Sequence, residues 1–443
     1  MKPAAPPHIL LAGNHTCGNR GDAAILRGLI DCLEEAAPDL RLTATSRFPV
    51  SSSYLLGRPL APDLLHDWPG EAAIRPYRLK KWWVGRTPRM LAAAVERGGP
   101  LPRAIPRAVR DRIGQLGQYD AVIQVGGSFF VDVYGDRQFE TPLCALLANR
   151  PLFLAGHSLG PFTTPSSHAL ARTLLSRADE VILRETASLD LLREAGLPLG
   201  RAQVAGDTAW LVRPGPDGRQ IHRSVMERTG GRPAVAVTLR DLAPFDKRLG
   251  VSQEEFESAF AALCTAFIGG GYDVIAVSMC TGIEGYRDDR IPALRVAEKV
   301  NRPGRFHVIV DELNDLEIGH LLSACSLLVG TRLHSAIIAM NFGTPAIALN
   351  YEHKSRGIMR ELGLPEAALD LPALLDGSLR PMAMRLAADS GQARARLRPR
   401  VERERAKARS GVHAILRHLG IGERKPARKA EPVEPEKSRS LVG

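Results

Sequence analysis

The sequence contains little that would form a disulfide framework or a metal site. Its six cysteines are scattered without a CxxC pair, and the chain lacks both the HExxH zinc motif and any tight group of acids. The Walker phosphate-binding motif is missing as well. We therefore expect free thiols that are buried or half-buried, no metal site and no bound cofactor.

Long apolar runs are also lacking. No run approaches the roughly 18 residues that cross a bilayer, and the N-terminus shows neither the charged region nor the cleavage site of a signal peptide. Aromatic residues make up only 5% of the chain, beside 44% hydrophobic and 24% charged residues, which is a globular composition. A chain of 443 residues predicts two domains and a tail. We expect a soluble, cytoplasmic protein.

The positive charge of the chain is local. The formal net charge is +11, and residues 391–443 hold 15 Lys and Arg against 6 Asp and Glu, which is +9. The remaining +2 leaves the core without a basic excess that would follow a phosphate backbone, so no nucleic-acid partner is expected. The Arg-rich stretch is either a solvated helix face or a peripheral contact with the anionic inner face of a membrane.

Short apolar strands alternate with amphipathic helices in both halves of the chain, which predicts parallel α/β sheets covered on both faces. Expected strands of the first half are residues 121–127, 151–160, 180–185 and 202–207, with helices over 166–178 and 187–195. A Pro-, Gly- and charge-rich break follows at 211–233, and the pattern restarts at 234–240.

We therefore predict an α/β protein with two Rossmann-like domains that face a cleft. The N-terminal domain covers residues 1–212 with an irregular insertion over 48–115, and the C-terminal domain covers 232–390. A basic helix and a disordered tail occupy 391–443. Ligands of open α/β sheets bind at the carboxyl ends of the strands, so the turns after the strands are the places to inspect.

The clearest cluster lies in GTRLHSAIIAMNFGTPAIALNYEHK. Arg332 and His334 come directly after an apolar strand, two residues apart, and we expect them to project to the same side of an extended segment. Lys354 would reach the same sheet edge after the next strand, and a helix N-terminus beginning near Ser335 would add free N–H groups. This combination predicts a small polyanion site that includes an acid/base. The alternative is a structural ion pair at Arg332 and a packed or capping His334.

Three turns of the first half offer further candidates, each with a structural alternative. Arg184 ends a strand, where a salt-bridge residue is equally typical. Asn14 and Asp22 lie in a Gly-rich turn before a helix that Asp22 could cap. Ser128 and Asp132 follow a strand, in a loop that could simply pack its aromatic residues. GHSLG is a literal G-x-S-x-G, but no helix follows Ser158 directly, so a nucleophile elbow is not predicted.

These motifs, in this order, resemble the polysaccharide pyruvyl transferase family over residues 9–365. The resemblance rests on GNRGD, the GG-x(4)-D of residues 126–132, LRETASLDLLREAGL, TLR at 238–240, and above all GTRLHS followed by YEHK. The family implies a glycosyltransferase-B-like fold and phosphoenolpyruvate as donor. It also implies that a pyruvate ketal forms across two hydroxyls of a glycan sugar, in exopolysaccharide or cell-wall glycan synthesis.

The resemblance implies functional roles for Arg184, Arg332, His334 and Lys354, with Arg240 in the matching TLR segment. On this interpretation Arg332, Arg184 and Lys354 hold the carboxylate and phosphate of the donor, and His334 protonates its methylene carbon. The partners are then phosphoenolpyruvate, bound by the C-terminal domain, and, on the side of the N-terminal domain, a glycan acceptor that a lipid could carry. The runner-up is a nucleotide-sugar glycosyltransferase of the same fold that uses Glu352 for the ribose. A third reading is a non-catalytic glycan- or nucleic-acid-binding protein.

Overall fold

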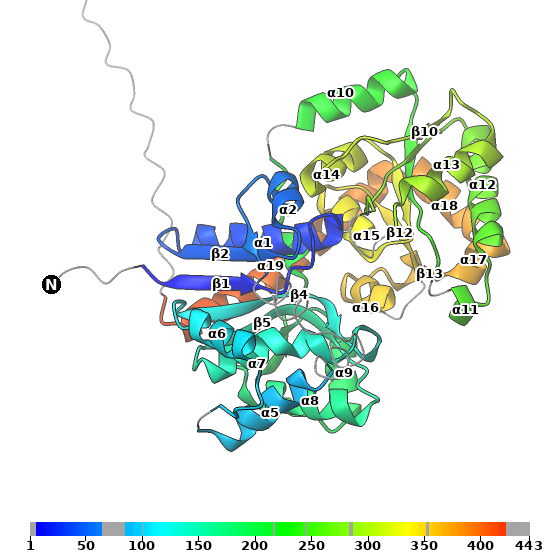
Figure 1. Cartoon of the computed structure of the whole chain (residues 1–443). Helices are drawn as coiled ribbons and strands as arrows, with labels where there is room; N and C mark the ends of the chain where they lie inside the picture. Colours follow the sequence, from blue (N-terminus) through cyan, green and yellow to red (C-terminus); the bar gives the residue numbers. More distant parts are fainter. Residues whose placement is uncertain are drawn as a thin grey trace, which may run out of the picture.

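The chain forms two α/β domains joined by helices that cross between them (Figure 1). The computed structural model describes residues 6–63, 85–99, 101–215, 218–243, 246–282, 287–350 and 354–421. Within these ranges every strand pairing inside the two sheets is parallel. The prediction of two Rossmann-like domains is confirmed.

The N-terminal sheet has seven strands in the order β3-β2-β1-β4-β5-β6-β7. Their bounds are β1 His8–Ala12, β2 Arg41–Ser46, β3 Ala61–Pro62, β4 Ala121–Phe130, β5 Leu152–Leu159, β6 Glu180–Leu183 and β7 Ala202–Val204. All eight residues of β5 are buried, including the polar His157 and Ser158 near its end, which fits a strand covered on both faces. The helices of this domain are α1 Arg20–Ala36, α2 Pro49–Leu56, α5 Thr87–Arg97, α6 Arg107–Leu116, α7 Glu140–Leu147, α8 Pro165–Arg177 and α9 Thr186–Glu194.

The C-terminal sheet has six strands in the order β10-β9-β8-β11-β12-β13. Their bounds are β8 Ala234–Thr238, β9 Asp273–Ala276, β10 Phe306–Val308, β11 Leu327–Gly330, β12 Ala346–Asn350 and β13 Ala368–Asp370. The helices are α10 Gly218–Thr229, α11 Asp246–Leu249, α12 Gln253–Gly269, α13 Arg290–Val300, α14 Asp315–Ser323, α15 Leu333–Asn341, α16 Lys354–Glu361, α17 Leu371–Leu375 and α18 Leu379–Ala388. Short 3-10 turns are η1 Asp132–Tyr134, η2 Asp136–Phe139, η3 Thr208–Leu211 and η4 Pro365–Ala367.

Two segments that were expected to be irregular are largely helical. The described parts of 48–115 include α2, α5 and most of α6, so the prediction of an irregular insertion is wrong there. Three prolines of this segment lie in or just before the first turn of a helix, where the missing N–H costs no helical hydrogen bond: Pro49, Pro88 and Pro106. Likewise α10 lies inside the expected break at 211–233 and packs on α14.

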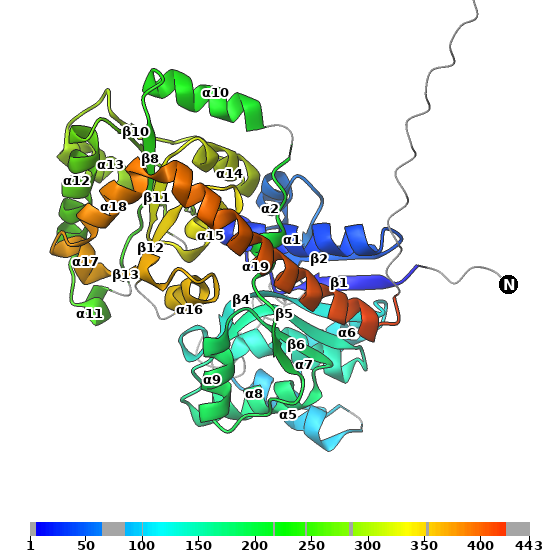
Figure 2. The ribbon, with the colours of Figure 1, turned by 180° about the vertical axis from the view of Figure 1, so that it is seen from behind.

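The basic C-terminal helix belongs to the folded body. α19 Ser390–His418 runs from the C-terminal domain onto the N-terminal sheet, where it contacts β5, β6 and η3 (Figure 2). Its buried stripe repeats every three, four or seven residues: Ala393, Leu397, Val401, Ala408, Val412 and Ile415. The predicted basic helix is therefore present, and its buried stripe shows that one of its faces packs on both domains. Residues 422–443 lie outside the described chain.

Helix α1 ties the two domains together. It contacts both α14 and α15 of the other domain. Arg27 donates to both carboxylate oxygens of Asp315 at 2.7 and 2.9 Å, and the backbone N–H of Arg20 donates to the carbonyl of Met279 at 2.9 Å. One apolar cluster accordingly includes residues of both sheets. The carboxyl ends of β1 and β8 are thereby held on facing sides of the same interface.

All six cysteines are free and buried, as predicted. None of the helices in the described residues is both long and apolar enough to cross a membrane.

Candidate active site

The candidate residues gather where the carboxyl ends of the two sheets approach each other. In the N-terminal domain Asn14 follows β1, Ser128 lies near the end of β4, and Arg184 directly follows β6. In the C-terminal domain Arg240 follows β8 and Arg332 follows β11. This arrangement agrees with the rule that ligands of open α/β sheets bind at the carboxyl edge.

His334 and Asp207 meet across the domain boundary. His334 is the second residue of α15, and Asp207 precedes η3 on the opposite domain. Nε2 of the imidazole lies 3.3 Å from Oδ2 of Asp207, and the His334 side chain is 16% exposed. A carboxylate at this position fixes the tautomer and the orientation of the ring, so that Nδ1 is left for other chemistry.

Arg184 forms the centre of a buried network. Its side chain is 1% exposed. Nη1 donates to Oδ2 of Asp207 at 3.1 Å, and Nη2 donates to Oγ of Ser128 at 2.6 Å. Nε contacts Oγ of Ser158 and Oε2 of Glu185 at 2.6 and 3.1 Å. Each nitrogen of the guanidinium therefore donates to a protein group, and Arg184 links Ser128 to the partner of His334.

The charge of Asp207 is held by its neighbours. Burial raises the pKa of this carboxyl group, but the hydrogen bond and charge of His334 and the charge of Arg184 outweigh it and lower the pKa to about 2. Its other oxygen accepts the backbone N–H of Ala209 at 2.9 Å, which caps η3. Asp207 is therefore ionised at neutral pH and available as a fixed acceptor.

Arg332 turns toward its own domain instead. Its Nε and Nη2 donate to the two carboxylate oxygens of Asp289 at 2.8 and 2.7 Å, and its side chain is 13% exposed. The expectation that Arg332 and His334 project together from an extended segment is wrong, because α15 begins at Leu333 and rotates the two side chains apart. The ion-pair alternative for Arg332 is confirmed as a contact.

Asp289 lies beside a second arginine. Burial raises the pKa of Asp289, although the charge and hydrogen bonds of Arg332 and the charge of Arg240 oppose the shift. Arg240 is itself buried, and its Nε donates to the carbonyl of Asp241 at 3.1 Å. The charges of Arg332 and Arg240 therefore both act on this carboxylate at the edge of the C-terminal sheet.

Of Lys354 and Glu352, the structure describes only the backbone of Lys354. The backbone of Lys354 begins α16, directly after the carboxyl end of β12, as predicted. Its side chain and Glu352 lie outside the described residues.

The Gly-rich turn before α1 packs on His334. Asn19, and not Asp22, caps the helix: its side chain accepts the N–H of Gly21 at 3.0 Å. Asn14 donates to the carbonyl of Asp22 at 3.1 Å, and both side chains are buried. A Cβ at residue 21 would lie 2.7 Å from Cβ, Cγ and Nδ1 of the imidazole. Only glycine therefore fits beside His334 at this position.

Ser128 and Asp132 were predicted as candidates of the same loop, but their side chains make contacts with different parts of the domain. Ser128 joins the Arg184 network. Asp132 accepts the backbone N–H of Thr163 at 2.6 Å and also the hydroxyl groups of Thr163 and Ser167. These contacts fix the turn before α8. Asp132 also lines a groove between α5 and α8.

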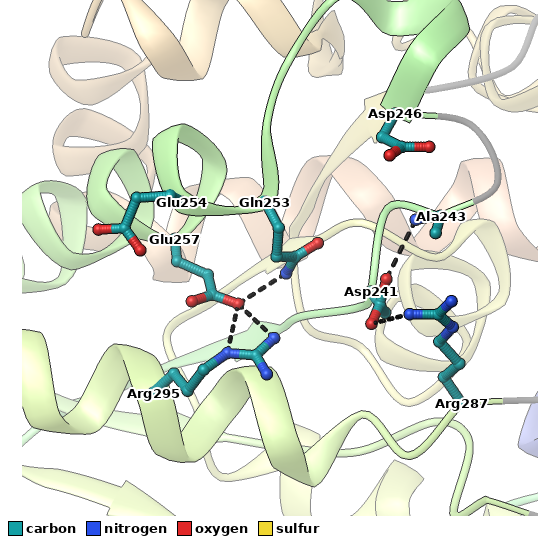
Figure 3. Close-up of a pocket in the computed structure, with 8 residues that line it drawn as sticks. All are labelled: Asp241, Ala243, Asp246, Gln253, Glu254, Glu257, Arg287 and Arg295. Atoms are coloured by element: carbon teal, nitrogen blue, oxygen red, sulfur yellow. Dashed lines mark hydrogen bonds and ion pairs between the residues drawn. The ribbon is translucent and has the colours of Figure 1, made fainter.

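A separate cavity of about 440 Å³ lies beside the loop that follows β8 (Figure 3). Oε1 of Glu257 accepts Gln253 at 2.7 Å and Arg295 at 2.6 and 2.8 Å. Asp241 accepts Arg287 at 2.6 Å and the N–H of Ala243 at 3.1 Å. The cavity includes none of the predicted site residues, and its wall is built from ion pairs.

Sequence reasoning missed three carboxylates that organise the site. Asp207 was not among the candidates, although it follows a strand as they do. Glu185 adjoins Arg184 and accepts Ser158 at 2.9 Å. Asp289 has no strand directly before it, so no local pattern marks it. Within the described residues no group of three or more His, Cys, Asp or Glu side chains could hold a metal ion.

Comparison with known proteins gives a family and a fold. The sequence model of the polysaccharide pyruvyl transferases matches residues 19–353. The amylovoran biosynthesis protein AmsJ of Erwinia amylovora is 48% identical over 377 residues, which cover 84% of this chain and 90% of AmsJ. The matched residues 19–353 include the turn that packs on His334. They also include Arg184, Asp207 and Arg332.

Solved structures with low identity show the same two-domain fold. The structure of Staphylococcus aureus MnaA with UDP has a TM-score of 0.57 at 12% identity, and the match covers 95% of this chain and 99% of that one. The UDP-GlcNAc 2-epimerase of Methanocaldococcus jannaschii has a TM-score of 0.51 at 14% identity, covering 84% and 91%. Anabaena HepE in complex with UDP-glucose has a TM-score of 0.51 at 15% identity, covering 92% and 99%.

Proposed function

The chain belongs to the polysaccharide pyruvyl transferase family, and we propose that it transfers a pyruvyl group from phosphoenolpyruvate to two hydroxyls of a glycan sugar. The product is a cyclic pyruvate ketal, made during exopolysaccharide synthesis. The observation that carries the proposal is the contact between His334 and Asp207, which sets one oriented acid/base between the carboxyl edges of two sheets.

The proposed reaction needs one proton donor and a place for a departing phosphate. His334 protonates the methylene carbon of the donor, which becomes a methyl group, and the adjacent carbon becomes electrophilic. One sugar hydroxyl adds to that carbon and loses its proton. The C–O bond to phosphate then breaks, and the second hydroxyl closes the ketal and gives up the other proton. The two hydroxyl protons balance the new methyl hydrogen and the protonated phosphate.

The basic side chains of the site have two different roles: some bind the donor, and one positions the acid/base. Arg332 is partly exposed, adjoins the N-terminus of α15, and shares Asp289 with Arg240, so we assign these two arginines, with Lys354, to the donor anions. Arg184 is too deeply buried for the same task. It acts instead as a positioning residue that holds Asp207 against His334 and holds Ser128 at the end of β4.

The histidine is the first residue to test. His334→Ala removes one acid/base, which is typically worth about 10²–10⁴ in rate, while the donor contacts remain. We expect phosphate release from phosphoenolpyruvate with a glycan acceptor to fall by that factor. His222→Ala is the matched control, because His222 is exposed on α10. Wild-type turnover in His334→Ala would remove the histidine from the mechanism.

Donor binding is tested separately by thermal unfolding. A ligand at one hundred times its dissociation constant adds about 2.7 kcal/mol of stability. We expect phosphoenolpyruvate to raise the melting temperature of the wild type and of His334→Ala, and to have no effect on Arg332→Met. A rise with a nucleotide sugar and none with phosphoenolpyruvate would instead favour a glycosyltransferase.

We further propose that the outer face of α19 contacts anionic lipid. Arg396, Arg398, Arg403 and Arg409 are exposed on this helix. Each basic residue near an anionic surface is worth about 1 kcal/mol. The protein should float with phosphatidylglycerol vesicles and not with phosphatidylcholine vesicles, and replacing the four arginines with glutamine should abolish flotation. Equal flotation of the variant and the wild type would show that this face of α19 does not contact the lipid.

A further inference from the structure

A groove of about 910 Å³ lies at the carboxyl edge of the N-terminal sheet, next to the catalytic network. Its walls come from α5, from the η1–η2 segment after β4, and from the start of α8 after β5. Figure 1 shows α5 and α8 side by side in this domain. The polar lining consists of Arg89, Glu96, Asp132, Asp136, Arg137 and Ser166. A groove of this volume is within the range of ligand sites.

The lining has the chemistry that carbohydrate recognition requires. Sugar hydroxyls both donate and accept, and the groove offers carboxylates as acceptors, guanidinium groups as donors, and the hydroxyl of Ser166 as both. Arg89, whose side chain is 60% exposed, donates to Ser166 at 2.7 Å, and Ser166 in turn contacts Asp136. Ala92, Ala93 and Ala169 give the groove small apolar wall positions. Carboxylates and guanidinium groups that are already aligned lose little freedom when a sugar binds.

The groove is joined to the catalytic network by a short segment of chain. Ser128 accepts a hydrogen bond from Arg184, which holds Asp207 and through it His334. Asp132 lies four residues further on, in the groove wall. Four residues of extended chain span at most about 14 Å, so the groove begins within an oligosaccharide's reach of the catalytic network.

We propose that this groove binds the sugar residues of the acceptor glycan that adjoin the residue receiving the pyruvyl group. The inference rests on the proposed function, because it takes a glycan to be the acceptor. It predicts that affinity grows with the length of the acceptor, since a single sugar would reach the catalytic network without filling the groove. It also assigns a task to α5, which belongs to the segment that the sequence marked only as an insertion.

The test uses gluco-, galacto- and manno-oligosaccharides of one to four residues as probes. Binding is measured by calorimetry without donor, so that it is read independently of pyruvyl transfer. We expect the wild type to bind at least one series with affinity that rises at least tenfold from one to four residues. Ala93→Trp should fill the groove and remove that rise, and Arg89→Ala should reduce it, while stabilisation by phosphoenolpyruvate stays unchanged in both variants.

The matched control is Arg107→Ala, because Arg107 is 88% exposed on α6 and does not line the groove. Length-dependent binding that survives in both Ala93→Trp and Arg89→Ala would overturn the proposal, as would binding by the wild type that does not depend on length or is absent for every series. Failure of the proposed function is distinguishable, because it would appear as glycan binding without phosphate release from phosphoenolpyruvate.

Discussion

Arg184 and Arg332 both lie between the carboxyl end of a strand and the start of a helix, yet their surroundings differ. Each follows the carboxyl end of a buried strand, β6 or β11, and each precedes a helix. Arg184 is 1% exposed and its contacts run to Ser128, Ser158, Glu185 and Asp207. Arg332 is 13% exposed and makes a two-point contact with one carboxylate. A place after a strand therefore does not by itself fix the contacts that an arginine makes.

The difference follows from the number of carboxylates around each guanidinium group. Two acids contact Arg184, so its charge is neutralised within the protein and serves to orient other groups. Arg332 makes its two-point contact with one carboxylate, that of Asp289, on which the charge of Arg240 also acts. A position after a strand suggests that an arginine is functional, but its partners decide whether it binds a ligand or positions a residue that does.

The largest expected effect comes from removing the buried arginine. Arg184→Met leaves Asp207 and Glu185 buried without their cation, which costs about 3–5 kcal/mol of folding stability. Arg332→Met should cost less, because Asp289 keeps the N–H groups of Met279 and Cys280 as donors and can take up a proton. Urea unfolding of the two variants measures the difference. Equal losses would contradict the division between positioning and binding.

A smaller expected effect comes from Gly21, which connects the two domains at the imidazole. Gly21→Ala adds a Cβ 2.7 Å from the ring of His334 and pushes it away from Asp207. A displacement of about 1 Å at a catalytic group can cost on the order of 10² in rate. We expect turnover to fall by that order while phosphoenolpyruvate still stabilises the protein.

Gly114→Ala provides the control for that experiment. A Cβ at residue 114, in α6, would meet nothing within 4 Å, so this substitution should leave turnover unchanged. Normal turnover in Gly21→Ala would show that the fit of the imidazole beside α1 does not matter.

The pH dependence of the unfolding free energy tests the contacts of Asp207. Its pKa is lowered from 3.8 to about 2, so the stability it contributes is present above about pH 4 and is lost as the pH falls through about 2. This shift corresponds to about 2 kcal/mol. Urea midpoints followed from about pH 5 to about pH 2 should fall less steeply in Asp207→Asn than in the wild type. Identical slopes would mean that His334 and Arg184 do not hold this carboxylate.

Much of the fold could be predicted from the sequence because buried parallel strands have a distinct pattern. Residues of β4, β5, β8 and β11 form apolar runs that end in glycine-containing or polar turns, and the structure confirms each of them. The packing of α19 on both domains was not predicted, because its apolar stripe is diluted by exposed arginines and shows only at helical spacing. Prolines misled the analysis of the insertion, since their effect depends on the position within a helix.

The site was predictable residue by residue but not as a set of contacts. Arg184, Arg332 and His334 were found from their places after strands. The partners Asp207 and Asp289 lie 23 and 43 residues away from the arginines that they contact, so nothing local in the sequence joins them. The prediction that Arg332 and His334 project together was wrong because the helix starts two residues earlier than expected: Arg332 keeps an extended backbone as the N-cap, whereas His334 already lies in α15.

The smallest expected effect tests whether the second network titrates in the opposite direction to the first. Burial raises the pKa of Asp289, so the proton on this group favours the folded state. Its contribution is present below the unfolded pKa and is lost as the pH rises through the folded pKa. Asp289→Asn should therefore lose less stability than the wild type as the pH rises, whereas Asp207→Asn loses less as the pH falls. Urea midpoints of both variants over the same pH series give the two slopes, and slopes of the same sign would mean that the two arginines hold their carboxylates in the same way.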